Sequence, residues 1–251
     1  MSERKKIIVT GASSGIGEAT AIRFAEEGWD VCLTARREER LKTLSGNLRP
    51  GDHLVRPGDY SDAETAASIS SAISESWGGV DALVNCAGVF MGGDAVEEDF
   101  AQWRRPFDIM VNGGLHMTRA AVPLMGKGGR VIHVTSIHGE RAERGGSAYA
   151  MAKAALNQFC RAMAIDLAPK GILINAIAPG FVDTPMSVVD GVNELESDWF
   201  RDNYVEGGHL PLQRAGRPEE IAGVAWFLAG PDATYVTGQV ITVDGGLSVT
   251  F

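Results

Sequence analysis

The sequence predicts an α/β fold of the doubly wound class, with about seven parallel strands covered by helices on both faces. Short β-branched runs recur at a spacing of roughly thirty residues and alternate with helical patterns. Several runs, such as residues 7–9 and 172–174, are continuously apolar, which is typical of strands buried on both faces. The 251 residues, 45% hydrophobic and 22% charged, are enough for one large domain with a sizeable core.

Seven β-branched runs are predicted as the strands of this sheet. In chain order they are residues 7–10, 31–35, 53–57, 82–85, 130–136, 172–178 and 240–244.

The segments between these runs carry signals for helix starts. Ser61 followed by Glu64 predicts a capping box, in which each side chain satisfies a free amide at the helix start. Pro218 predicts another start, because proline needs no donor at the first helical position. Residues 182–212 form an irregular stretch that is longer than connections in compact domains usually are. We expect this stretch to be a substrate lid inside a single domain of residues 1–251.

Composition excludes several function classes. The formal charge of −9 repels phosphate backbones, so no nucleic-acid partner is expected. The apolar run at residues 7–9 is too short for a signal peptide and no run reaches the length of a membrane span, which predicts a cytoplasmic protein without a membrane partner. The three cysteines are far apart and are predicted as reduced thiols. The five histidines form no HExxH pattern, so no metal is expected.

A glycine-rich turn, TGASSGIG at residues 10–17, directly follows the first predicted strand and opens a helix. A pyrophosphate group needs exposed amides, a positive helix end and a backbone without Cβ atoms in the way. The spacing is GxxxGxG rather than GxGxxG, and a turn of small residues kept for packing is the alternative. The predicted cofactor contacts in this turn are Gly11, Ser13, Ser14, Gly15, Ile16 and Gly17.

The end of the second predicted strand favours NADP over NAD as the cofactor. An acid at this place would hold the 2′-hydroxyl of NAD, but Arg36 and Arg37 stand there, and guanidinium groups suit a 2′-phosphate. The alternative is that both arginines begin a solvated helix and pair with Glu38 and Glu39. Asp59 either accepts from the adenine amino group or caps the next helix.

Tyr149 and Lys153 lie four residues apart on a strongly helical segment, so their side chains share one face. A phenol with a pKa of about 10 is a poor base at neutral pH, but an adjacent ammonium favours the phenolate. Ser136, at the end of the fifth predicted strand, is placed to hydrogen-bond the same reacting oxygen. The three residues therefore predict proton transfer at one oxygen atom.

These motifs resemble the classical short-chain dehydrogenases/reductases over nearly the whole chain. The matching segments are residues 10–17, NCAG at residues 85–88 where the family usually has NNAG, Ser136 with Tyr149 and Lys153, Pro179-Gly180, Thr184, and residues 236–239 and 243–246.

The resemblance implies a Rossmann-type domain that commonly assembles as a homotetramer or homodimer. It implies that Tyr149 is the general acid/base, that Lys153 lowers the pKa of this tyrosine and binds the nicotinamide ribose, and that Ser136 orients the substrate oxygen. Asn112 matches the asparagine that holds a water in a proton relay to Lys153, although Gly113 and Gly114 weaken the helix that follows it. The further cofactor contacts are Asp59, Tyr60, Asn85, Ala87, Gly88, Pro179, Gly180, Val182 and Thr184.

Residues 137–146 are unusually charged for a segment that borders the substrate pocket in this family. They favour a polar or ionised substrate, with a solvated rim as the alternative. The predicted substrate contacts are Ser136, His138 and Trp199, whereas His133 is predicted to lie in the core. Trp199, Phe200 and Tyr204 fall on one side of a short helical pattern, either to shield the reacting centre or to contact another subunit.

The sequence therefore predicts an NADP(H)-dependent oxidoreductase that interconverts a carbonyl and a secondary alcohol on a small, polar molecule. One alternative is an NAD(H)-dependent alcohol or sugar dehydrogenase of the same family. Another is a 3-oxoacyl-acyl-carrier-protein reductase, against which the acidic lid counts, since like charges repel an acidic carrier protein. The remaining alternatives are an epimerase or dehydratase on the same fold and a non-catalytic dinucleotide-binding sensor.

Overall fold

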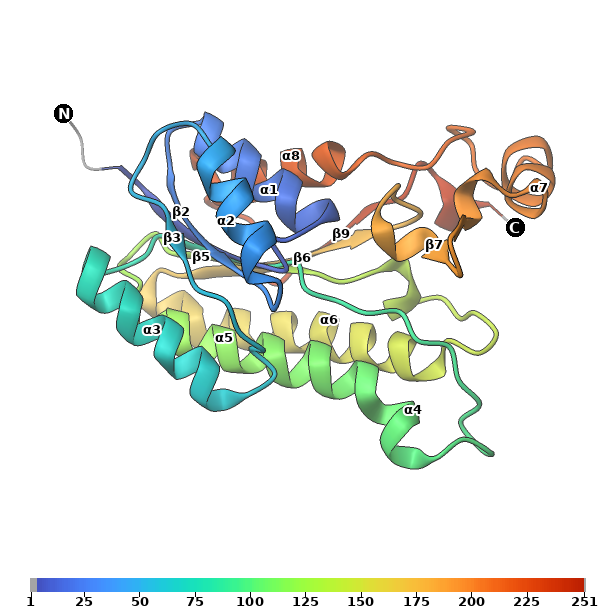
Figure 1. The fold of residues 1–251 in the computed structure, drawn as a ribbon, viewed down its shortest axis with the longest axis horizontal. Coiled ribbons are helices and arrows are strands. Elements are labelled where there is room, and N and C mark those ends of the chain that lie inside the picture. Colours follow the sequence, from blue (N-terminus) through green and yellow to red (C-terminus); the bar gives the residue numbers. More distant parts are fainter. Residues whose placement is uncertain (1–3, 251) are drawn as a thin grey trace.

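The computed structural model describes residues 4–250, which form a seven-stranded parallel sheet with helices on both faces (Figure 1). The strand order is β3-β2-β1-β4-β5-β6-β9, and it reverses between β1 and β4. The strands are β1 (Lys6–Thr10), β2 (Asp30–Thr34), β3 (Leu54–Val55), β4 (Ala82–Asn85), β5 (Arg130–Val134), β6 (Leu173–Pro179) and β9 (Val240–Val243). The prediction of a doubly wound parallel sheet is confirmed, although β3 and β5 are shorter than expected.

The helices divide between the two faces of the sheet (Figure 1). One face carries α1 (Gly15–Glu26), α2 (Glu38–Asn47) and α8 (Pro218–Ala229), and the other carries α3 (Ala63–Trp77), α4 (Phe100–Phe107), α5 (Gly113–Ala121) and α6 (Ser147–Leu167). Side chains alternate along β1 between two apolar cores, with Ile7 and Val9 in one and Ile8 in the other. Both faces of the central strands are therefore buried, which explains their continuously apolar sequences.

The start of α3 differs from its predicted capping pattern by one residue. The Asp62 carboxylate, not Ser61, caps the helix, because it accepts from the amides of Glu64 and Thr65 at 3.3 and 3.0 Å. The amide and hydroxyl of Ser61 donate instead to Asp59 Oδ1, at 3.1 and 2.6 Å. A carboxylate offers two acceptor oxygens to the free amides, whereas a serine hydroxyl offers one atom.

The predicted start at Pro218 is confirmed, since α8 begins at this residue. The Glu220 carboxylate completes the start by accepting from the amide of Arg217 at 2.7 Å.

A π-helix, Asp108–Asn112, joins α4 to α5, and a short 3-10 turn, Val122–Leu124, follows α5. The two glycines that open α5 are needed for close packing. A Cβ atom on Gly113 would lie 2.7 Å from the Tyr60 ring, and one on Gly114 would lie 3.2 Å from His133. The low helix propensity of the pair is thus the cost of bringing α5 against its neighbours.

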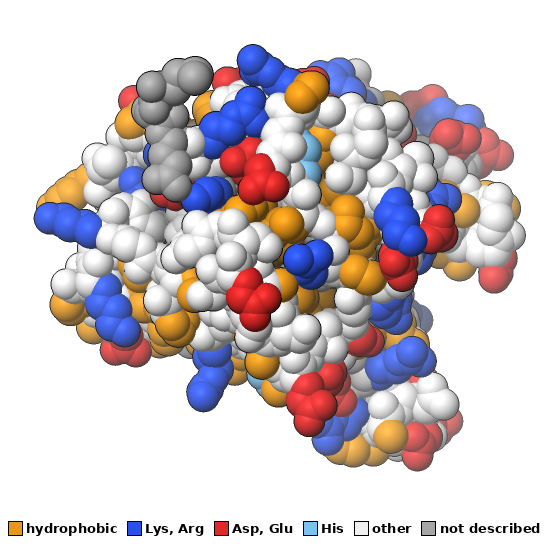
Figure 2. Space-filling view, turned by 60° about the vertical axis from the view of Figure 1, so that its left-hand side comes forward, with side chains coloured by type: hydrophobic (Ala, Val, Ile, Leu, Met, Phe, Trp, Pro, Cys, Tyr) orange, Lys and Arg blue, Asp and Glu red, His pale blue; other side chains and the backbone are white. Residues whose placement is uncertain are grey.

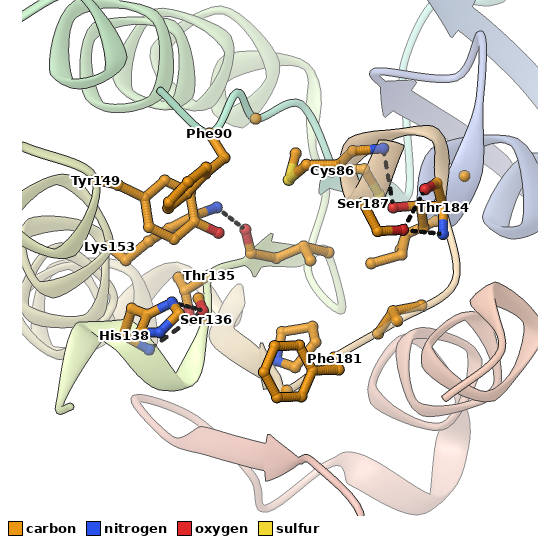
Figure 3. Close-up of a pocket in the computed structure, with 18 of the residues that line it drawn as sticks. Cys86, Phe90, Thr135, Ser136, His138, Tyr149, Lys153, Phe181, Thr184 and Ser187 are labelled. Carbon is orange, nitrogen blue, oxygen red and sulfur yellow. Dashed lines mark hydrogen bonds between the residues drawn. The ribbon is translucent and has the colours of Figure 1, made fainter. Parts of the chain in front are cut away.

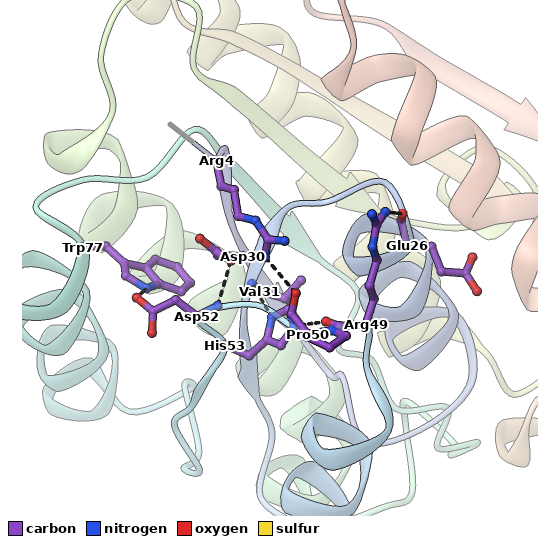
Figure 4. Close-up of polar contacts among 9 residues, drawn as sticks. All are labelled: Arg4, Glu26, Asp30, Val31, Arg49, Pro50, Asp52, His53 and Trp77. Atoms are coloured by element: carbon purple, nitrogen blue, oxygen red, sulfur yellow. Dashed lines mark hydrogen bonds and ion pairs between the residues drawn. The ribbon is translucent and has the colours of Figure 1, made fainter. Parts of the chain in front are cut away.

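At the amino-terminal edge of the sheet, a group of polar side chains ties the loop before β3 to β2 (Figure 4). This amino-edge cluster consists of Arg4, Asp30, Arg49, Asp52, His53 and Trp77. Asp30 accepts from Arg4 Nη1 at 3.2 Å and from the Asp52 amide at 2.9 Å. Asp52 Oδ2 accepts from Trp77 Nε1 at 3.1 Å. The cluster thus satisfies the carboxylate of Asp30, the buried charged group among its members.

The predicted lid contains only short elements. It includes 3-10 turns at Pro185–Ser187 and Glu194–Glu196, a two-stranded hairpin of β7 (Val188–Val189) and β8 (Val192–Asn193), α7 (Asp198–Phe200) and a π-helix at Arg201–Glu206. This stretch lies at the end of the molecule toward which the strands point (Figure 1).

Charged side chains of both signs are scattered over the face shown in Figure 2, rather than gathered by sign. Within residues 4–250, no helix is long and apolar enough to cross a membrane.

Candidate active site

A pocket of about 720 Å³ opens at the carboxyl-terminal edge of the sheet, where ligands bind in open α/β folds. Its walls come from the glycine-rich turn, from the loops that follow β2, β4, β5 and β6, from α6 and from the lid. The predicted site residues that line it are Gly11, Ser13, Ser14, Gly15, Ile16, Gly17, Arg36, Arg37, Asp59, Tyr60, Ala87, Gly88, Ser136, His138, Tyr149, Lys153, Pro179, Gly180, Val182, Thr184 and Trp199.

Two predicted site residues, Asn85 and Asn112, are not among the described residues that line this pocket. Asn85 lies in β4 and is buried between Thr10, whose hydroxyl is 3.4 Å from Asn85 Oδ1, and His133. Asn112 ends the π-helix and its Nδ2 donates to Asp108 Oδ1 at 3.3 Å. The structure thus gives Asn85 a role between strands, and it leaves the relay role of Asn112 a prediction.

The glycine-rich turn combines tight packing with an open helix start. Gly11 has a φ of 67°, and a Cβ on it would lie 2.9 Å from the backbone of Ala87. A Cβ on Gly17 would collide with the carbonyl of Gly11. Close packing therefore accounts for these two glycines. The amides at the start of α1 remain uncapped, because the Ser14 side chain accepts no hydrogen bond from them. Uncapped amides at the positive end of a twelve-residue helix suit a pyrophosphate.

The two arginines after β2 are exposed and line the pocket. Arg37 Nη2 donates to the hydroxyls of Ser13 and Ser14, at 2.8 and 2.7 Å. Both arginines directly precede the exposed first turn of α2, as the alternative interpretation expected. The pairing with Glu38 and Glu39 is not observed among the described ion pairs, because both acids pair with Lys42 at 3.0 Å. Positive charge is therefore available beside the glycine-rich turn.

Three side chains meet at the centre of the pocket (Figure 3). Ser136 follows β5 and caps a 3-10 turn, whereas Tyr149 and Lys153 project from α6, and all three are buried. Lys153 Nζ donates to the carbonyl of Val134 at 3.0 Å and lies 5.4 Å from the centre of the Tyr149 ring. The Ser136 side chain lies near enough to Tyr149 to favour the phenolate form of that residue.

Burial dominates the electrostatics of this centre. It raises the pKa of Tyr149 to about 12, whereas the Ser136 side chain lowers this pKa and the nearby Glu143 carboxylate raises it. Burial lowers the pKa of Lys153 to about 8. The net shift of the Tyr149 pKa is therefore upward, and the lowering of this pKa by Lys153 stays a prediction.

The two histidines near the fifth strand have different environments. His133 is buried in β5, where Nε2 lies 3.2 Å from the Thr118 hydroxyl and burial lowers the pKa of the ring to about 3. Its prediction as a core residue is confirmed, although its Nδ1 has no hydrogen-bond partner among the described residues. His138 lines the pocket, with its ring edge-on to that of Tyr149 and Nε2 3.2 Å from Glu143 Oε2.

Aromatic rings form much of the remaining wall. Phe181 packs 4.7 Å from Tyr204 and 5.1 Å from Phe200, and Phe90 packs 5.3 Å from the Tyr149 ring. Trp199 lies at the mouth, 59% exposed and 5.3 Å from Tyr204. Phe90 and Phe181 were not predicted as site residues, although each lies within two residues of a family motif.

Neither metal nor thiol chemistry is indicated. No group of three or more His, Cys, Asp or Glu side chains in the described part of the chain is arranged to hold a metal ion. The three cysteines are free, as predicted. Cys86 lines the pocket, but burial raises the pKa of its thiol to about 12, which makes it a poor nucleophile.

Known proteins resemble this chain over nearly its full length. A family model described as enoyl-(acyl carrier protein) reductase matches residues 11–248. Glucose 1-dehydrogenase of Gluconobacter oxydans is 34% identical, over 98% of this chain and 92% of that protein. The 3-oxoacyl-acyl-carrier-protein reductase of Thermotoga maritima is also 34% identical, over 98% and 99%. A structure of an actinorhodin polyketide ketoreductase variant with NADPH has a TM-score of 0.89 at 31% identity, covering 98% of each chain.

Proposed function

The chain belongs to the classical short-chain dehydrogenase/reductase family of NAD(P)-dependent oxidoreductases, and from this we propose that it transfers hydride between NADP(H) and a small, polar carbonyl or secondary alcohol. The observation that carries the proposal is the meeting of Ser136, Tyr149 and Lys153 in the same pocket as the uncapped start of α1. A non-catalytic sensor would need the helix start but not the three side chains.

The residues of the chain perform the proton transfer in this proposal. The bound nicotinamide cofactor supplies or accepts the hydride. The substrate oxygen lies between the hydroxyls of Ser136 and Tyr149, which line the same pocket. In reduction, Tyr149 donates its proton to the oxygen as negative charge develops there, and Ser136 stabilises that charge with a hydrogen bond. In oxidation the proton moves in the opposite direction.

Lys153 would act on both the cofactor and the tyrosine. Its Nζ is fixed by the Val134 carbonyl, on the side of the pocket where Gly88 also lies. From this position the ammonium would bind the nicotinamide ribose, as in the family. A positive charge brought in with an oxidised nicotinamide would favour the phenolate of Tyr149 and so offset the effect of burial.

The choice of NADP rests on Arg36 and Arg37. Titration of the protein with NADPH and NADH, followed by fluorescence, tests it. We expect tighter binding of NADPH, and loss of that preference in Arg36→Asp. Arg40→Asp is the matched control, since it makes the same charge reversal in the exposed first turn of α2. Equal binding of both cofactors would favour the NAD(H)-dependent alternative.

A polar substrate is supported by the loop after β5, which contributes His138, Arg141 and Glu143 to the pocket wall. The aromatic wall opposite would contact the less polar part of the molecule. A panel of ketones, aldehydes and hydroxyketones assayed with NADPH tests this. Turnover without net oxidation or reduction of the cofactor would favour the epimerase or dehydratase alternative.

A carrier-protein substrate is less well supported. The lid around the pocket mouth carries one base, Arg201, against seven acids, which are Asp183, Asp190, Glu194, Glu196, Asp198, Asp202 and Glu206. Arg201 lies between Asp198, Asp202 and Glu206, at 2.9, 3.4 and 3.6 Å, so its charge is already matched. An acidic carrier would meet repulsion at this surface.

A further inference from the structure

Ser136, His138 and Glu143 form a connected chain at the centre of the pocket (Figure 3 shows the first two). Ser136 Oγ lies 3.4 Å from Nδ1 of His138, and Nε2 of the same ring lies 3.2 Å from Glu143 Oε2. The Ser136 side chain is buried, the ring is 22% exposed and Glu143 is 44% exposed. A hydroxyl, an imidazole and a carboxylate are thus arranged in series from the reacting centre to the rim.

The Ser136 hydroxyl has one proton and two lone pairs to share among its neighbours. The amide of His138 donates to Oγ at 3.2 Å and uses one lone pair. The hydroxyl proton then has two acceptors available, Nδ1 of His138 and a substrate oxygen held between Ser136 and Tyr149. Only the second arrangement stabilises charge on the substrate.

Glu143 determines which ring nitrogen of neutral His138 carries the hydrogen. A carboxylate can only accept, so the contact with Oε2 keeps the hydrogen on Nε2 and leaves Nδ1 as a bare acceptor facing Ser136. When the ring gains a proton, Nδ1 becomes a donor instead. It then occupies the second lone pair of Ser136, and the hydroxyl proton is left for the substrate oxygen.

We propose that His138 and Glu143 are positioning residues that decide whether Ser136 donates its hydrogen bond to the imidazole or to the substrate. The inference rests on the proposed function, because the direction of this hydroxyl matters only when a substrate oxygen lies against it.

The groups that face the His138 ring make carbonyl reduction depend on pH. Glu143, from the same loop, raises the pKa of the ring, whereas burial and Lys153, from α6, lower it, with a net shift below 6.5. Tyr149 contributes its ring edge from α6, and Tyr204, in the lid, faces Glu143. At neutral pH the ring is therefore mostly neutral, and protonation in mild acid directs Ser136 to the substrate.

The pH profile of kcat/KM for NADPH-dependent carbonyl reduction tests the proposal. We expect the wild-type kcat/KM to rise roughly tenfold as pH falls through an ionisation below pH 6.5. The rise is smaller than the roughly 10²–10³-fold that one hydrogen-bond donor to an oxyanion contributes, because Ser136 already donates to the substrate part of the time at neutral pH. The ionisation should move to lower pH in Glu143→Gln, because the carboxylate no longer stabilises the imidazolium. It should be absent in His138→Asn, which cannot titrate in this range.

Glu140→Gln is the matched control for Glu143→Gln. It removes the same charge from the same loop, but Glu140 pairs with Arg161 at 3.2 Å instead of with His138. Its pH profile should match that of the wild type. An acid ionisation that persists in His138→Asn, or equal shifts in both glutamine variants, would overturn the proposal.

Nitrogen NMR of the histidine rings gives a second readout that needs no substrate. The signal missing from the His138→Asn spectrum identifies His138 among the five histidines. We expect hydrogen on Nε2 in the wild type and a mixture of both tautomers in Glu143→Gln. Hydrogen on Nδ1 in an active wild-type enzyme would overturn the positioning role alone. A protein that binds NADPH but reduces no carbonyl would overturn the proposed function and the positioning role together.

Discussion

Polar side chains have different roles at the two edges of the central sheet. At the amino-terminal edge, Asp30 and Asp52 bind partners within the amino-edge cluster (Figure 4). At the carboxyl-terminal edge, Ser136, Tyr149 and Lys153 are buried but border a pocket of about 720 Å³ (Figure 3). Parallel strands place all their carboxyl ends together, so one edge can be devoted to ligands and the other to holding the loops.

His53, in the amino-edge cluster, and His133, behind the pocket, differ in how completely their ring nitrogens are hydrogen-bonded. His53, in the amino-edge cluster, accepts the Val31 amide with Nδ1 at 3.1 Å and contacts the Arg49 carbonyl with Nε2 at 2.7 Å. His133, in β5, has one contacted nitrogen, and its Nδ1 is buried without a hydrogen-bond partner among the described residues. Asn157, in the helix that carries Tyr149, also has a buried amide group without such a partner. Polar groups behind the pocket are therefore less completely satisfied than those of the amino-edge cluster.

The largest effect is expected at the carboxyl-terminal edge. Tyr149→Phe should lower kcat for carbonyl reduction by about 10²–10⁴-fold, the usual contribution of a general acid/base, while NADPH binding stays nearly unchanged. Steady-state rates and fluorescence titration measure the two quantities. Tyr235→Phe, at a fully exposed tyrosine, is the control. Loss of NADPH binding in Tyr149→Phe would contradict the assigned role.

Acid should destabilise the protein through His133. The unfolded chain binds a proton at this residue below pH 6.5, whereas the native protein does so only near pH 3. Between these values the unfolded state holds more protons, so the free energy of unfolding falls with decreasing pH, by up to about 1.4 kcal/mol per pH unit from this group.

Denaturant melts of wild type and His133→Gln between pH 7 and pH 4 measure this loss. We expect a flatter acid branch in the variant, because glutamine carries no titrating group. Equal slopes in both proteins would place the acid sensitivity elsewhere.

Asp30→Ala should affect stability and leave the chemistry intact. It removes the acceptor of the Arg4 guanidinium and of the Asp52 amide, which predicts a loss of about 1–3 kcal/mol in the free energy of unfolding. The kcat and the NADPH affinity should stay at wild-type values. Asp232→Ala, at an exposed acid in the 3-10 turn after α8, should change stability by less than about 0.5 kcal/mol. A lower kcat in Asp30→Ala would contradict the assignment of a purely structural role to the amino-terminal edge.

The smallest effect is expected at the mouth of the pocket. Trp199→Ala removes a half-exposed ring that contacts Tyr204 and lines the pocket, so KM should rise or kcat fall by roughly threefold to tenfold. Val192→Ala changes an exposed lid residue that is outside the pocket lining and serves as the control. Unchanged kinetics in Trp199→Ala would remove the lid interpretation.

Much of the site could be predicted from the sequence because its signals are local. The glycine-rich turn comes directly after an apolar strand, and Tyr149 and Lys153 share a helix face through their spacing alone. Ser136 follows the run that forms β5. These features depend on neighbours within a few residues, and the parallel sheet then brings them to one edge.

The tertiary structure decided the remaining features. The environment of Asn85 depends on Thr10 and His133, which lie far from it in the sequence. The contact between His138 and Glu143, and the rings of Phe90 and Phe181, have no periodic signal.

Burial also sets the upward net direction of the Tyr149 pKa shift, and burial depends on all surrounding elements. Periodicity and turn chemistry are properties of a short segment, and the sequence of this protein determined them by itself. Burial, partner choice and the shape of the pocket arise only when distant segments pack, because desolvation and contact depend on three-dimensional neighbours.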